Sequence, residues 1–209
     1  MNKNIIKELK NHAPFTIFGA MTGIILMFFL YKIPSGISYN IFYILHPIHV
    51  FLSALATTAI YKIYKKKPNL IILILVGYIG SIGIATMSDS IIPYLGELLL
   101  NLPNKGIHIG FIEKFWLVNS LAFLGIIVAY FYPKTKIPHA GHVLLSTWAS
   151  LFHIIMALGV IINPFLILII FIFLFISVLL PCCLSDIIFP LLFIKKTPTK
   201  KRNFIKNKI

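Results

Sequence analysis

The chain has 209 residues, of which 59% are hydrophobic and 11% are charged, and its formal net charge is +14. With a mean hydropathy of +0.95, this composition is typical of an integral membrane protein and excludes an ordinary water-soluble fold. We expect no nucleic-acid partner, because the positive charge lies in short segments beside apolar runs, where it sets membrane topology.

Six apolar runs follow one another along the chain, each about as long as the roughly 20 residues that a membrane-spanning helix needs. They lie near residues 15–31, 41–61, 70–92, 115–132, 142–162 and 165–194. The sequence therefore predicts an all-α, polytopic membrane protein with about six transmembrane helices in contact with the lipid bilayer.

The basic residues predict how these helices are oriented. Most Lys and Arg residues precede the first and fifth runs, separate the second from the third, or follow the last, whereas Lys32, Lys105 and Lys114 fall on the other side. Because cytoplasmic loops are enriched in basic residues, both termini are predicted to be cytoplasmic, in an inner or plasma membrane. The basic tail at 195–209 is predicted to contact anionic lipid headgroups at the cytoplasmic face.

Two stretches of the chain are nearly the same. HPIHVFLS at 46–53 resembles HAGHVLLS at 139–146, and a Ser-Asp pair follows each of them, at 88–89 and 185–186. We interpret this as a duplication, with a first membrane repeat at 1–100, a second at 101–194, and the tail at 195–209.

Each predicted repeat contains three spans, and an odd number means that the second copy enters the membrane from the opposite side. The repeats are therefore expected to be inverted in topology. Inverted repeats of this kind recur in secondary transporters, where related sites in the two halves exchange exposure; the comparison is one of architecture only.

Two histidines and one aspartate recur in each copy: His46, His49 and Asp89 in the first, and His139, His142 and Asp186 in the second. Histidines three residues apart share a helix face. Two imidazoles and a carboxylate suit a divalent metal such as Zn, Fe or Mn, or a proton relay in which the aspartates exchange protons or compensate charge.

The predicted orientation places the first set toward the outer leaflet and the second toward the cytoplasmic leaflet, although the two sites could merge at the midplane. The alternative is that each aspartate only neutralises its own histidines at the membrane surface. Haem is not favoured, because His46 and His49 share one helix face, whereas bis-histidine haem needs ligands from facing helices.

Other polar residues give weaker signals. Ser53 and Ser146 occupy matched places beyond the histidine pairs and could line a transport or proton path, or simply bond to helix carbonyls. His153 has no counterpart in the first copy and is expected to be a packed or interfacial residue. Glu97 and Glu113, expected in the longest external loop, are candidate extra ligands or ordinary solvated residues.

The pattern favours a transporter that moves a divalent metal cation, or a proton-coupled small solute, through the paired His-Asp sites. The alternative is an intramembrane metal-dependent enzyme, a hydrolase or oxidase with a two-histidine, one-aspartate site. The common hydrolase and nucleotide-binding motifs are absent from the sequence. A structural partner of another membrane protein is the third possibility.

Overall fold

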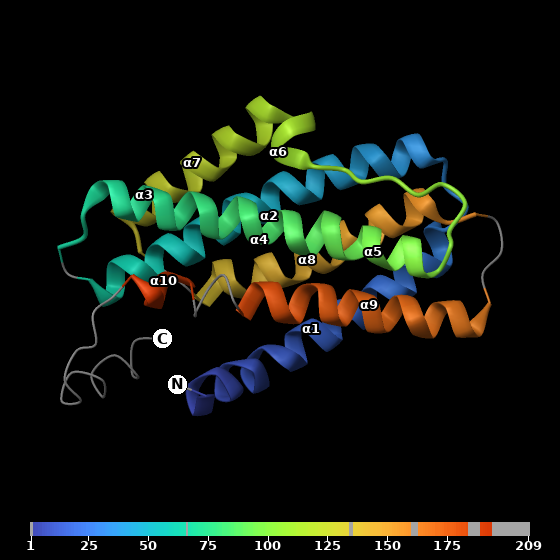
Figure 1. Ribbon diagram of the computed structural model, residues 1–209, viewed down its shortest axis with the longest axis horizontal. Helices are drawn as coiled ribbons and strands as arrows, with labels where there is room; N and C mark the ends of the chain where they lie inside the picture. The colour runs from blue at the N-terminus through green and yellow to red at the C-terminus, as the bar shows by residue number, and fades with distance from the viewer. Residues whose placement is uncertain (1, 66, 134–135, 160–162, 184–188, 194–209) are drawn as a thin grey trace.

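The computed structural model describes residues 2–65, 67–133, 136–159, 163–183 and 189–193, and these residues are helical or connecting, with no β-strand among them (Figure 1). The prediction of an all-α protein is confirmed for this part of the chain. The helices are α1 (Asn2–Leu30), α2 (Ser35–Tyr64), α3 (Leu70–Tyr78), α4 (Ile84–Thr86), α5 (Ile92–Leu99), α6 (Gly110–Glu113), α7 (Phe115–Phe131), α8 (Lys136–Ala157), α9 (Pro164–Cys183) and α10 (Phe189–Leu192). Two π-helical segments, η1 (Ile79–Gly83) and η2 (Met87–Ile91), join α3, α4 and α5 into one continuous rod.

Two asparagines mark where helices begin. The side chain of Asn69 accepts hydrogen bonds from the backbone N–H groups of Ile71 and Ile72 at the start of α3. Asn163 accepts one from Leu166 at 2.7 Å, directly before the proline that opens α9. An asparagine at the N-cap, with proline at the first helical position, satisfies backbone donors that have no partner inside the helix.

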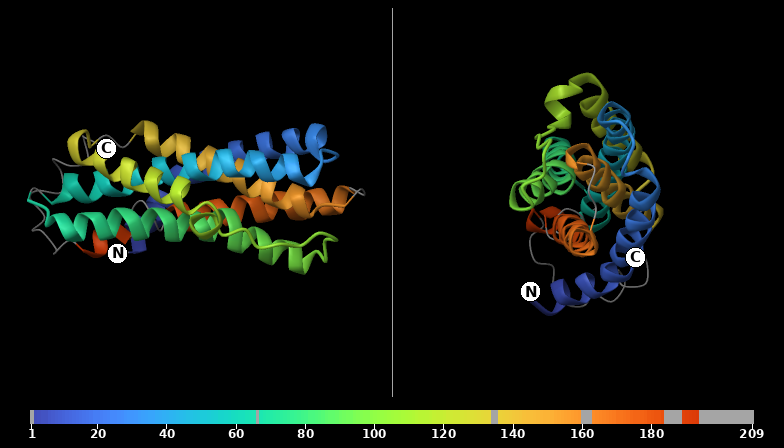
Figure 2. Two further views of the ribbon diagram at one scale, coloured as in Figure 1. Left: turned by 90° about the horizontal axis from the view of Figure 1, so that it is seen from above. Right: turned by 90° about the vertical axis from the view of Figure 1, so that its right-hand side faces the viewer.

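The helices run side by side along the long axis of the molecule, and α2 lies between α7 and α8, with which it has its most extensive contacts (Figure 2). We name the two ends of the bundle after α3 and α5, the first and last helices of the rod. At the α3 end lie the start of α3 and the last turn of α2. At the α5 end lie the end of α5 and the start of α2 (Figure 1).

Three helices are long and apolar enough to cross a membrane: Ser35–Tyr64, Leu70–Leu99 and Pro164–Cys182. Three shorter apolar helices, Thr16–Leu30, Phe115–Phe131 and Gly141–Ala157, correspond to the remaining predicted runs. The protein thus has the helices of a membrane protein, whereas six spans and the inverted repeat stay predictions.

The bundle is apolar on its outside, and its interior holds many polar side chains among the apolar ones of the core, unlike the interior of a typical soluble protein. Large apolar side chains such as Phe29 and Trp116 are 79% and 81% exposed, while Thr57, Ser88 and His142 are buried. An apolar surface of this extent marks contact with lipid or with another apolar surface. The polar interior must then be satisfied by its own hydrogen bonds.

The π-helical segment η2 explains an unusual run of buried polar residues. Ser88, Asp89 and Ser90 are consecutive and all fully buried. A π-helical turn accommodates one more residue than an α-helical turn, and such turns occur frequently at functional sites. The rod continues through Pro93 into α5, because the proline lies at the start of an α-helix, where a missing N–H costs little.

The segment 100–109, which we call the return segment, does not simply cap the α5 end. It runs back along the bundle to about mid-length, where α6 and α7 begin (Figure 1). Its backbone donates to the carbonyl of Ala157 from Asn104 and to the side chain of Glu97 from Gly106. Irregular backbone at membrane depth is tolerated where the protein satisfies its polar groups in this way.

Glu113 attaches the far end of the return segment. Its carboxylate accepts hydrogen bonds from the backbone N–H of Ile109 at 3.0 Å and from the Tyr39 hydroxyl at 3.3 Å. Burial raises the pKa of Glu113, but hydrogen bonds and the nearby His108 outweigh it and hold the pKa below its ordinary value of 4.5.

We expect this attachment to weaken in acid. A carboxyl whose pKa is lower in the folded state contributes stability at pH values above 4.5, and that contribution is lost as the pH falls through the lowered pKa. Protection of the amides of residues 106–112 against hydrogen exchange, corrected for the intrinsic pH dependence of exchange, should therefore decrease between pH 5 and pH 3. In Glu113→Gln, this corrected protection should be lower at pH 5 and should not decrease further in acid. A wild-type profile in that variant would contradict the assignment.

Candidate metal centre

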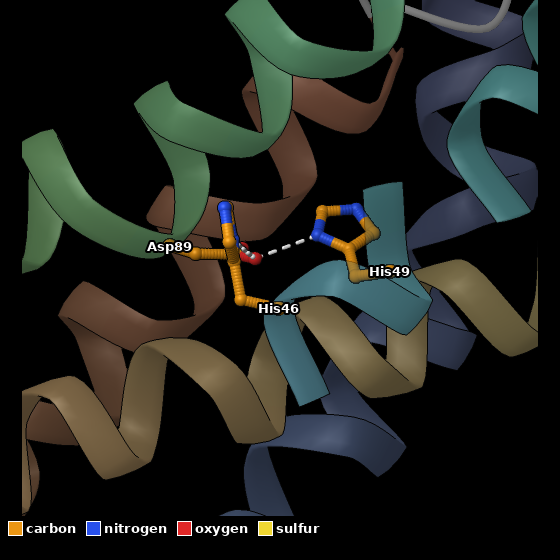
Figure 3. A group of neighbouring side chains, drawn as sticks. All are labelled: His46, His49 and Asp89. Carbon is orange, nitrogen blue, oxygen red and sulfur yellow. Dashed lines mark hydrogen bonds and ion pairs between the residues drawn. The ribbon is translucent and has the colours of Figure 1, made fainter. Parts of the chain in front are cut away.

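Both histidines of the first motif lie within hydrogen-bond distance of Asp89. Nδ1 of His46 lies 2.9 Å, and Nδ1 of His49 2.7 Å, from the same carboxylate oxygen, Oδ2 of Asp89 (Figure 3). The two rings project from successive turns of α2 and the carboxylate from η2. All three side chains are buried, at 1% exposure or less.

The second oxygen of Asp89 is held by two serines. Ser88 and Ser146 donate their hydroxyls to Oδ1 at 2.7 and 2.8 Å. Ser146 belongs to α8, so this contact joins the second histidine motif to the first. Ser150, one turn further along α8, lies within hydrogen-bond distance of the Ser88 carbonyl at 2.9 Å and of the Ser146 carbonyl at 2.8 Å. Asp89 is thus satisfied on both oxygens, as a buried carboxylate must be.

Aromatic rings enclose the histidines. His142 of α8 stacks on His49 with ring centroids 5.7 Å apart and planes 7° from parallel. Phe42, one turn before His46, stacks on His46 at 5.2 Å. The rings of both motif histidines are therefore held by stacking as well as by the hydrogen bonds to Asp89.

Gly110 closes the site from the side of α6. A Cβ atom at this position would lie 2.4 Å from both Cδ2 and Nε2 of His46, which is closer than real contacts allow. Only glycine lets the start of α6 approach the imidazole this closely. The return segment therefore leads directly into Gly110, and the absence of a side chain at Gly110 leaves room for the His46 ring.

His46, His49 and Asp89 form a group that could hold a metal ion, with ligand atoms all within 4.8 Å of one another. In a tetrahedral zinc site with bonds of about 2.0–2.1 Å, neighbouring ligand atoms lie roughly 3.3 Å apart. The observed separations of 2.7 and 2.9 Å are hydrogen-bond distances, so a cation would enter after the three groups spread by about half an ångström. The donor set fits a borderline cation such as Zn²⁺, Fe²⁺ or Mn²⁺.

The residues of the second motif are only partly described. His142 and Ser146 lie at the Asp89 site, whereas the expectation from the sequence placed His142 in a second site toward the opposite leaflet and left open whether the two sites merge at the midplane. The reason is that α8 packs along α2 at the level of the first histidine pair, as the His49–His142 stack shows. His139 lies in α8, but its side chain is outside the described residues, as is Asp186 with its neighbouring Ser185. Ser53 is buried in α2, one turn beyond His49.

A second buried pair was not expected from the sequence. His153 of α8 lies 2.7 Å from Glu97 of α5, Nδ1 to Oε1, and both side chains are at 1% exposure or less. Glu97 had been assigned to an external loop, which is wrong, because α5 extends to Leu99 and carries Glu97 on its buried face. The signal in the sequence is that Glu97 stands among apolar residues, in YLGELLL at 94–100, rather than among polar loop residues.

No family model, curated protein or solved structure matches this chain.

Proposed function

We propose that the protein is a multi-pass membrane transporter that binds a divalent cation at His46, His49 and Asp89 and moves that cation, or a proton-coupled small solute, across the bilayer. The observation that carries the proposal is the complete burial of this ligand set between two long apolar helices. His49 lies about 14 residues from the start of α2, or roughly 21 Å along a helix of about 45 Å. Ionisable residues at such depth in membrane proteins mark ion or proton pathways.

A line of buried polar side chains along α2 supports a path through the bundle. They recur mostly at intervals of three or four residues, which places them on one face of the helix. From the α5 end to the α3 end they are Ser38, His46, His49, Ser53, Thr57 and Thr58. In the proposal, the cation site stands near the middle of this line.

The remaining predictions complete the proposal. The two three-helix repeats form the pathway with both termini in the cytoplasm of an inner or plasma membrane, and the basic tail contacts anionic lipid headgroups. This orientation puts the α5 end outside. Asp186 and His139 contribute the second copy's share of charge compensation and cation binding.

An intramembrane metal-dependent hydrolase or oxidase is the second candidate function. Ser88 and Ser146 bond to Asp89, and His142 stacks on His49, so residues of both copies gather at one site. This favours an enzyme, because catalysis needs one site with all its groups, whereas alternating access uses two related sites. In this case the cation would be a resident cofactor that activates water or oxygen.

Uptake by sealed vesicles separates the two candidates. Purified protein in proteoliposomes that contain a metal-sensitive dye should admit Zn²⁺, Fe²⁺ or Mn²⁺ with saturation, and His46→Ala/His49→Ala should reduce uptake to the level of empty vesicles. Ser177→Ala serves as the matched control and should behave as wild type, because it removes a buried hydroxyl of α9 that lies off this line and bonds the Leu174 carbonyl of its own helix. Binding of the cation without uptake would favour the enzyme.

A further inference from the structure

An apolar groove with a volume of about 120 Å³ lies between α3 and α7 at the α3 end of the bundle. Leu73 and Ile126 are buried and form its floor. Leu70, Ile127 and Phe131 are each more than half exposed and form its rims. Every side chain that lines the groove is aliphatic or aromatic. On a bundle with an apolar outside, a groove of this kind suits an acyl chain rather than water.

The groove is closed toward the middle of the bundle and open toward the α3 end. A Cβ atom at Gly77 of α3 would lie 2.7 Å from Cγ1 of Ile126, so α3 and α7 are in close contact at this level. Leu73 and Leu70 lie one and two turns nearer the α3 end, where α3 begins and α7 ends (Figure 1). An apolar cavity of about 150 Å³ holds one benzene molecule, so this groove accommodates a segment of one acyl chain.

A lysine is held at the open end of the groove. The Lys62 ammonium group donates to the backbone carbonyl of Tyr130 and lies 4.3 Å from the centroid of the Tyr130 ring, which lines the groove. Lys65, three residues later on the same face of α2, lies 5.8 Å from the centroid of the Tyr61 ring. An ammonium group has three N–H donors and the carbonyl accepts from one of them, so Lys62 can also donate to a ligand.

The positive charge beside the groove has no acidic residue near it in the sequence. Residues 55–80 contain four lysines and neither Asp nor Glu, and residues 115–133 contain no charged residue. Tyr130 and Tyr132 stand at the end of α7, and tyrosines gather at the level of the lipid headgroups. Charge complementarity therefore favours a negatively charged headgroup at Lys62, directly beside an apolar groove for its acyl chain.

We propose that Lys62 and the groove between α3 and α7 bind one anionic glycerophospholipid, whose phosphate accepts from Lys62 and whose acyl chain packs against Leu73 and Ile126. In the predicted orientation this site lies in the cytoplasmic leaflet, which is rich in anionic lipid. The site is separate from the basic tail and does not rest on the cation site. The simpler role of Lys62 is to cap the last carbonyls of α7, which a cation stabilises without any lipid.

Lipid retention tests this proposal. Delipidated full-length protein in detergent is incubated with equal amounts of phosphatidylglycerol and phosphatidylcholine that have the same acyl chains, and native mass spectrometry counts the lipids bound per chain. Wild type should retain about one phosphatidylglycerol in preference to phosphatidylcholine. Lys62→Gln, which can still donate to the Tyr130 carbonyl but has no charge, should bind phosphatidylglycerol about fivefold more weakly, the share of one lysine at an anionic surface. Ile127→Trp, which fills the groove, should lower retention at least as much.

Two matched controls should retain lipid as the wild type does. Lys105→Gln removes a lysine in the return segment, and Ile71→Trp enlarges an exposed side chain of α3 that does not line the groove. Equal retention of the two lipids by the wild type would overturn the inference. So would wild-type retention in Lys62→Gln or in Ile127→Trp, because the site needs both the charge and the groove. If Ile127→Trp does not give monodisperse protein, Phe131→Ala, which removes one rim, takes its place.

Discussion

Replacing Asp89 with asparagine should weaken cation binding by about 100-fold or more, or about 2.8 kcal/mol at 1.4 kcal/mol per factor of ten. The amide has the size of the carboxylate and keeps one oxygen for the serines or the histidines, so the helices should still pack. It lacks the negative charge that balances the cation, and its NH₂ group would face an N–H donor or a hydroxyl. Isothermal titration calorimetry with Zn²⁺ measures the change.

Glu113→Gln is the matched control for Asp89→Asn. It removes another carboxylate that has a histidine neighbour, but at a partly exposed position outside the cation site. Its Zn²⁺ affinity should stay within about twofold of wild type. Equal affinities of Asp89→Asn and wild type would mean that Asp89 only neutralises its histidines, which is the alternative that the sequence left open.

Gly110→Ala should disrupt the same site from the opposite side. The added methyl group would lie 2.4 Å from two atoms of the His46 ring, so the ring must rotate away from Asp89 or α6 must move outward. The backbone itself accepts alanine, because no glycine among the described residues has a positive φ angle. We therefore expect a steric effect on His46 alone, with cation affinity reduced by about tenfold or more.

Gly106→Ala provides the comparison for Gly110→Ala in the same region of the chain. Its Cβ would first meet His108 at 3.4 Å, an ordinary contact distance, so binding should be unchanged. Thermal unfolding monitored by circular dichroism separates a local effect from a global one, since Gly110→Ala should lose affinity while its melting temperature falls by only a few degrees. Wild-type affinity in Gly110→Ala would contradict the close approach of α6 to His46.

The helices could be predicted from the sequence because long apolar runs bounded by basic residues have few other structures available. The first half of the site could be predicted for a related reason. Histidines three residues apart on a helix share a face, and a buried aspartate needs partners, so His46, His49 and Asp89 were expected to meet. The structure brings these three side chains together within hydrogen-bond distance.

The contribution of α8 could not be predicted in the same way. Counting residues from the turns assumes regular α-helices, but η1 and η2 change the rotation of the rod and decide which side chains face inward around Asp89. The sequence carries no signal for these π-helical turns. Nor does it show that the return segment runs back to mid-length and places Gly110 against His46, because that path depends on tertiary contacts.

Glu97 was misplaced because a charged residue near the end of an apolar run usually marks the end of a span. Here the carboxylate lies inside the bundle, 2.7 Å from His153, which comes more than 50 residues later in the chain. Because this partner is distant in the sequence, the residues around Glu97 do not indicate it. His153 was expected to be a packed or interfacial residue because the first copy has no counterpart to it; the side chain is indeed buried, but the sequence did not indicate its contact with Glu97.

Metal content is the most direct test of the central claim that His46, His49 and Asp89 bind a divalent cation. Elemental mass spectrometry on detergent-purified protein, exposed to Zn²⁺ and then washed, should find about one metal per chain in the wild type and none in His46→Ala/His49→Ala. A reduced content in His142→Ala would indicate that the second motif shares the site. An equal metal content in wild type and His46→Ala/His49→Ala, or no metal in either, would contradict the claim.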